Sequence, residues 1–162
     1  MDINEALLDS WDRQAKIVNA VVGLVNESNR KAKPSPDGWP LDYHLAHIHA
    51  VRQEWLSHLS KSRSEGFKEA FTDGWTTPIE SLDEIRELLK ESGIAVRESV
   101  ADKIASGCGS CGGYDNPVLY LQHMVWHEGW HVGLILLGLR LVDQAPSDEW
   151  EEENVWGQWR TE

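Results

Sequence analysis

The sequence has no long hydrophobic run and few basic residues. None of its apolar segments reaches the roughly 20 residues of a transmembrane helix, and the start, Met1 to Glu5, lacks the basic-then-apolar order of a secretion signal. Fifteen lysines and arginines against 27 acidic residues give a formal net charge of -12, which repels phosphate backbones and anionic lipids. These absences argue against nucleic acid and membranes as partners, and we expect a cytoplasmic protein.

Cysteine and phenylalanine are also scarce. The two cysteines, Cys108 and Cys111, form a single C-x-x-C in a glycine-rich run, which suits a redox couple or half of a zinc site. No second pair exists to complete a four-cysteine site, and no βαβ pattern lies nearby, so we expect a loop pair without a catalytic role. Two phenylalanines stand against nine tryptophans, most of which we expect to pack in the core or at its rim.

What is present is helical periodicity. The length of 162 residues fits one domain, 1–162. Apolar residues recur at spacings of three and four in four segments, which predict helices at 3–29, 41 to about 61, 82 to about 104 and 117 to about 142. Residues 31–40 and 65–78 are rich in proline, glycine or threonine and form long connections. The predicted fold is all-α, an antiparallel four-helix bundle with an acidic, tryptophan-rich C-terminal tail after residue 143.

Local signals refine these helix boundaries. Asp42 is a candidate cap for the second helix, Ser81 begins a Ser-x-x-Glu capping box, and Asn116 precedes a proline at the first helical position. Gly93 is the weakest point of the third helix. The aromatic residues of the second connection, Phe67, Phe71 and Trp75, should pack down onto the helices.

Histidines carry the functional signal. His127 and His131 are four residues apart, so they project from one face of the last helix and two imidazoles can converge on one metal ion. A polar sector of that helix, which contains Gln122, Gly129, Gly133 and Arg140, should face solvent, while Met124, His127 and His131 lie opposite it. His123 falls near the boundary of the buried face, and Glu128 projects toward the buried side.

A third ligand must come from another helix. In the second helix the apolar stripe places His44 nearer its centre and His47 at an edge, so periodicity prefers His44, although a ligand at a seam between helices is equally suitable. His49 and His58 should lie at the surface or rim. Spacing alone leaves metal binding and simple packing equally open. Burial favours the metal, because buried imidazoles need partners for their ring nitrogens.

The chain resembles the DinB superfamily over nearly its whole length. The resemblance rests on Trp39 followed eight positions later by His47, and on the segment His127-Glu128-x-x-His131-x-Gly133. It implies a four-helix bundle whose metal is bound by His47, His127 and His131, and it selects His47 over His44. Leu134 stands where the family often has glutamine. The closing segment 156–160 is similar to family tails that pack near the bundle, and family members often form homodimers.

The resemblance also implies chemistry. Characterised relatives include thiol-dependent transferases, so the leading hypothesis is a metal-dependent enzyme that transfers a low-molecular-weight thiol to an electrophilic small molecule. Zinc is the first candidate metal and nickel the second, and Glu128 or His123 is a candidate base or orienting residue. The alternatives are a metal-dependent hydrolase that uses bound hydroxide and a stress-response protein that binds metal without turnover.

Overall fold

The computed structural model describes residues 2–160, and all regular elements in that range are helices. The long helices are Ile3–Gly23 (α1), Leu41–Leu59 (α2), Leu82–Ala105 (α4) and Pro117–Arg140 (α5). The short elements are Lys61–Ser64 (α3), Asp148–Glu151 (α6), the π-helical Glu152–Trp156 (η1) and the 3₁₀ turn Gly157–Trp159 (η2). In the same range, β pairing is limited to two isolated bridges, Phe71 with Pro78 and Cys111 with Tyr114. The predicted all-α class is confirmed.

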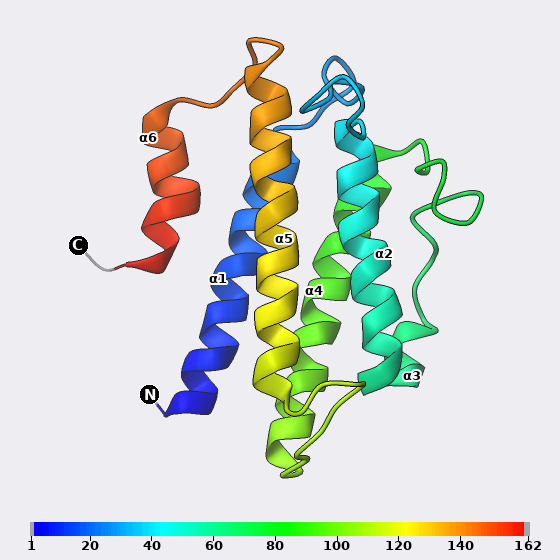
Figure 1. The fold of residues 1–162 in the computed structure, drawn as a ribbon, viewed down its shortest axis with the longest axis vertical. Helices are drawn as coiled ribbons and strands as arrows, with labels where there is room; N and C mark the ends of the chain where they lie inside the picture. Colours follow the sequence, from blue (N-terminus) through cyan, green and yellow to red (C-terminus); the bar gives the residue numbers. More distant parts are fainter. Residues whose placement is uncertain (1, 161–162) are drawn as a thin grey trace.

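The four long helices lie side by side, and each contacts at least two of the others (Figure 1). α1 and α5 run in one direction, and α2 and α4 run in the opposite direction (Figure 1). The predicted antiparallel arrangement therefore holds for α1 with α4 and for α2 with α5. In contrast, α2 and α4 are parallel, because the connection 65–81 returns along the molecule before α4 begins. This arrangement is compatible with the predicted four-helix bundle.

The C-terminal segment folds back onto α1. α6, η1 and η2 follow one another beside the long helices, and both η1 and η2 contact α1 (Figure 1). Val155 is buried, and Nη1 of Arg13 donates a hydrogen bond of 2.5 Å to the carbonyl of Gln158. The segment thus packs against the helices, as the resemblance implied. Across residues 2–160, no helix combines the length and the apolarity that crossing a bilayer requires.

Most helix starts follow the sequence signals. The Asp2 carboxylate accepts hydrogen bonds from the amides of Asn4 and Glu5 at the start of α1. The Ser81 hydroxyl caps α4 by accepting from the Glu84 amide. Asn116 caps α5, with a proline directly after it, as predicted. These side chains satisfy amides that have no partner within the helix.

One predicted helix end and one predicted cap are wrong. α1 ends at Gly23 and not near residue 29, because Asn29 bonds the local backbone instead: its side chain accepts from the Asn26 amide and donates to the Leu24 carbonyl. Asp42 does not cap α2 either. It lies inside the first turn and is fully buried, and Pro40 occupies the capping position without a side-chain hydrogen bond.

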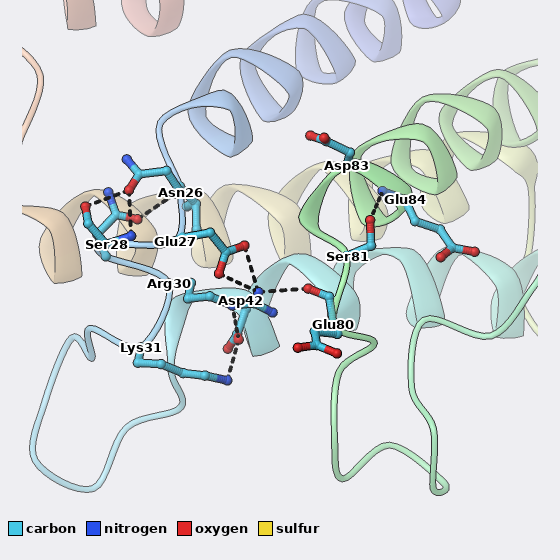
Figure 2. Close-up of polar contacts among 12 residues, drawn as sticks. Asn26, Glu27, Ser28, Arg30, Lys31, Asp42, Glu80, Ser81, Asp83 and Glu84 are labelled. Carbon is cyan, nitrogen blue, oxygen red and sulfur yellow. Dashed lines mark hydrogen bonds and ion pairs between the residues drawn. The ribbon is translucent and has the colours of Figure 1, made fainter.

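The buried Asp42 fastens the two long connections to the start of α2 (Figure 2). Its carboxylate accepts from Nε of Arg30 at 3.0 Å and pairs with Nζ of Lys31 at 2.6 Å. Nη1 of Arg30 also donates to the Glu27 carboxylate and, at 2.8 Å, to the carbonyl of Glu80. Since Arg30 lies in the connection 24–40 and Glu80 lies near the end of the connection 65–81, a single guanidinium holds both connections at the start of α2.

The apolar core consists of two clusters. The first contains Leu41, Leu45, Leu89 and Ile135, and the second contains Trp11, Val96, Tyr120 and Met124. Gly93 does not interrupt α4. Its carbonyl accepts a hydrogen bond from Nε1 of Trp11 at 2.9 Å, and a Cβ at this position would lie 3.2 Å from Nη1 of Arg52. The glycine therefore provides room for an arginine between the helices.

Candidate metal centre

Three histidines converge between α2 and α5. His47 comes from α2, and His127 and His131 come from successive turns of α5. Nε2 of His127 lies 3.4 Å from Nε2 of His47 and 3.1 Å from Nε2 of His131. One ligand atom from each residue lies within 4.8 Å of the other two. The structure therefore brings together, from two helices, the three histidines that the resemblance implied.

The rings are set up as neutral nitrogen donors. Burial, followed by the charge of the neighbouring His47, lowers the pKa of His127 to about 4. Burial, followed by the charges of His127 and His47, lowers the pKa of His131 to about 2. Burial also lowers the pKa of His47. All three imidazoles are therefore neutral at neutral pH, which is the form that binds metal.

The positions of the ring nitrogens suit a divalent cation. Nε2 of His127 faces two other nitrogens but carries at most one proton, so hydrogen bonds alone cannot satisfy all three atoms. A tetrahedral ion at about 2.0–2.1 Å from each nitrogen would separate them by about 3.3–3.4 Å, which is close to the distances found. In addition, Nδ1 of His47 and Nδ1 of His127 are buried without a hydrogen-bond partner in the described part of the chain. The donor set fits a metal.

His44, which periodicity favoured, lies behind the cluster. It is buried in α2, and its Nδ1 lies 2.8 Å from Nδ1 of His131. Burial, followed by the charge of His47, lowers its pKa to about 4. His47 at the seam between helices joins the three-histidine group, as the resemblance implied.

Aromatic side chains from both connections surround the cluster. Trp39 is 45% exposed, and its ring stacks at 9° to the His131 ring, with centroids 6.5 Å apart. Trp75 meets the His47 ring edge to face at 5.4 Å. The Tyr43 hydroxyl donates to the Trp75 carbonyl at 2.9 Å. Trp75 has a φ of 72°, a strained conformation for a bulky residue, and such strain is most common at functional sites.

Glu128 points to an arginine. Its carboxylate is fully buried and receives two hydrogen bonds from Arg52, Nε to Oε1 at 2.6 Å and Nη2 to Oε2 at 2.9 Å. Arg52 also donates to the Leu89 carbonyl at 2.6 Å and lies over the Trp11 ring. The sequence analysis missed Arg52. Its signal was present, because Arg52 continues the buried α2 series of Leu41, Leu45 and Ile48 at helical spacing.

The other histidines lie outside the group. His123 is part-buried, its Nδ1 pairs with the Tyr114 hydroxyl, and its ring centroid is 6.5 Å from that of His127. His58 is exposed, as expected. The expectation that His49 lies at the surface is wrong. It is fully buried, and its Nδ1 and Nε2 lie 3.1 Å and 3.2 Å from the carbonyl oxygens of Leu88 and Lys68, one of which accepts the single N–H of the neutral ring. The connection after α3 covers that side of α2.

The loop that carries Cys108 and Cys111 lies at the C-terminal end of α2. Cys111 is buried and Cys108 is part-buried, and both are free thiols. Burial, followed by the charge of Cys108, raises the pKa of the Cys111 thiol, which disfavours a reactive thiolate. A Cβ at Gly112 would come within 2.3 Å of Cβ of His58, so the loop packs tightly on α2.

Comparison with known proteins finds one family whose model matches the chain. The model of the DinB superfamily matches residues 9–135, a range that contains His47, His127 and His131. No curated protein and no solved structure matches the chain significantly.

Proposed function

The chain belongs to the DinB superfamily, whose members bind metal, and from this premise we propose that it is a metal-dependent enzyme that transfers a low-molecular-weight thiol to an electrophilic small molecule. The observation that supports this most is the convergence of three imidazoles between α2 and α5. Facing helices of a four-helix bundle commonly provide such sites. Three neutral donors leave the ion its positive charge and an exchangeable position, as in catalytic zinc sites. Zinc is therefore our first choice, and nickel is the second.

The proposed reaction is a nucleophilic substitution or addition at carbon. When bound, the metal supplies positive charge that lowers the pKa of a thiol at its open position, so that the sulfur is ionised near neutral pH. The sulfur forms a bond to the electrophilic carbon, and the electron pair of the broken bond departs with the leaving group or stays on the opened acceptor. The thiol proton passes to a base or to water.

The surroundings suit a flat, unsaturated acceptor. Trp39 and Trp75 flank the histidines from two different connections, and Tyr43 holds the Trp75 backbone by a hydrogen bond. Aromatic walls of this kind favour stacking with planar substrates and keep water away from the sulfur. Quinones and similar conjugated electrophiles are therefore the first acceptors to test.

We assign different roles to Glu128 and His123. Both oxygens of Glu128 bind Arg52, so its role is to orient the face of α5 that carries His127. His123 lies one turn before His127, and the Tyr114 hydroxyl occupies its Nδ1, which leaves Nε2 to take up the thiol proton. Replacing His123 with glutamine should then lower turnover without removing the metal.

Metal analysis followed by an activity screen tests the proposal. The purified protein should contain about one divalent ion per chain, and His47→Ala and His127→Ala should lose it, whereas the exposed His58→Ala on the same helix should not. Bacillithiol, mycothiol and glutathione are then offered with quinone, epoxide or halogenated acceptors, and the metal-loaded protein should consume one of these pairs. A protein that never binds metal refutes the proposal. Metal with ester or amide cleavage alone supports a hydrolase, and metal without turnover supports a binding protein.

We also propose that two copies pair through α5. This helix is apolar nearly all round, a property typical of buried helices, yet one face is open. Trp126 and Trp130 lie next to each other on that face, with ring centroids 6.1 Å apart and ring planes tilted by 30°, and they are 69% and 59% exposed. Sedimentation should show a dimer that Trp130→Glu dissociates, whereas Ile94→Glu, a change of an exposed isoleucine on α4, should preserve it. A monomeric wild type at micromolar concentration argues against the pairing.

A further inference from the structure

One buried polar contact beside the three histidines remains without a role. Nδ1 of His44 lies 2.8 Å from Nδ1 of His131, and the two ring centroids are 5.1 Å apart. Both side chains are buried, at 2% and 4% exposure. The contact joins α2 to α5 directly behind the nitrogen of His131 that faces the cluster.

The contact fixes where the protons are. Nε2 of His131 faces His127, so this atom has to be free of a proton to bind a metal. A neutral imidazole then carries its proton on Nδ1, which makes Nδ1 of His131 the donor and Nδ1 of His44 the acceptor. The proton of His44 must therefore be on its own Nε2, which is buried without a hydrogen-bond partner within residues 2–160. If both Nδ1 atoms carried protons, they could not approach to 2.8 Å.

The other two members of the cluster lack such a partner. Nδ1 of His47 and Nδ1 of His127 are buried without a hydrogen bond within residues 2–160. His131 is thus the member whose ring is oriented before any ion arrives. Metal-binding histidines usually donate their second N–H to a carboxylate or a carbonyl, and loss of that acceptor commonly weakens metal affinity about 10–100-fold.

We propose that His44 is a positioning residue that holds His131 in its metal-binding tautomer and ring orientation. This inference rests on the proposed metal site. An imidazole acceptor adds no negative charge, whereas the carboxylate found in many such pairs would partly neutralise the ion. The choice of histidine therefore keeps the centre strongly electron-withdrawing, which suits the ionisation of a bound thiol.

Zinc affinity of His44 variants tests the proposal by competition with a chelator. His44→Leu removes the acceptor, and we expect zinc binding to weaken about 10–100-fold. His44→Asn restores an acceptor oxygen near the place of Nδ1 and should stay within about threefold of wild type. His44→Asp should bind zinc more tightly than wild type but turn over thiol more slowly. His49→Leu is the matched control, because His49 is also buried in α2 but bonds Leu88 and Lys68, so it should change stability and not affinity.

A second measurement uses the unaltered protein, so it does not depend on a variant that folds. Long-range proton–nitrogen NMR of the metal-free protein should show His131 protonated on Nδ1. A proton on Nε2 of His131 overturns the inference, as does a His44→Leu protein that binds zinc like wild type. If the wild type binds no metal at all, the proposed function fails, while the NMR result still reports on the His44–His131 pair.

Discussion

Two polar groups join α2 to α5, and they differ in how their atoms are satisfied. In the Arg52–Glu128 pair, the guanidinium donates to both carboxylate oxygens and to the Leu89 carbonyl, all within the chain. In the histidine group, one nitrogen faces two others, and two further nitrogens are buried without partners among the described residues. A buried polar group that the protein satisfies by itself holds the fold together, and one that it leaves incomplete is suited to a ligand.

The largest expected effect comes from the Arg52–Glu128 pair. Glu128→Leu leaves the buried Arg52 charge without a counterion and should lower the free energy of unfolding by about 3–5 kcal/mol. The double variant Arg52→Met/Glu128→Leu should recover most of this loss, since apolar packing can replace a buried ion pair. Urea unfolding of the metal-free proteins measures both. If Glu128→Leu lowers the free energy of unfolding by less than about 1 kcal/mol, the ion pair does not hold α2 and α5 together.

The histidine group should behave in the opposite way. Zinc at about 100 times its Kd should raise the free energy of unfolding of the wild type by about 2.7 kcal/mol, and it should add nothing to His127→Leu. Without metal, His127→Leu should be as stable as wild type or slightly more stable, because it removes a buried nitrogen that has no partner in residues 2–160. Thermal unfolding with and without chelator checks both statements. Destabilisation of the metal-free variant by several kcal/mol would erase the contrast between the two groups.

The smallest effect concerns pH. In the folded metal-free protein, burial and then the neighbouring His47 lower the pKa of His127 to about 4, from 6.5 in the unfolded chain. Between pH 4 and pH 6.5 the unfolded chain binds more protons than the folded chain. The free energy of unfolding is therefore highest above pH 6.5 and falls as pH is lowered toward 4. His127→Leu should flatten this slope by less than about 1 kcal/mol per pH unit, since solvent screens a part-buried ring. Unfolding at several pH values in chelator measures the difference, and an unchanged slope contradicts it.

The sequence predicted what repeats along one helix. Spacing by four placed His127 and His131 on one face, and apolar periodicity located the four long helices. Periodicity favoured His44 over His47, because the pattern of one helix does not show where α5 lies relative to α2. Only the family motif identified His47. The pattern of α2 alone showed neither that His44 supports His131 nor that Arg52 pairs with Glu128.

Irregular segments account for the other errors. His49 was assigned to the surface because the α2 pattern gives no sign that the chain around Lys68 covers it. Asp42 has the chemistry of a cap, but Arg30 and Lys31 draw its carboxylate into the interior. The strained backbone of Trp75 likewise has no sequence signal, since bulky residues rarely adopt a positive φ. In each case the deciding contact comes from a connection with no periodic pattern.

The position of Arg52 has a consequence for how the protein unfolds. Its guanidinium contacts Leu89 of one apolar cluster and Trp11 of the other, and it pairs with Glu128 of α5, a helix that contributes residues to both clusters. If one cluster unfolds far enough for water to reach the Arg52 guanidinium, the contacts of Arg52 with the other cluster are lost at the same time. The two halves of the core should therefore melt together in a single all-or-none transition, with no stage at which one end has frayed and the other persists.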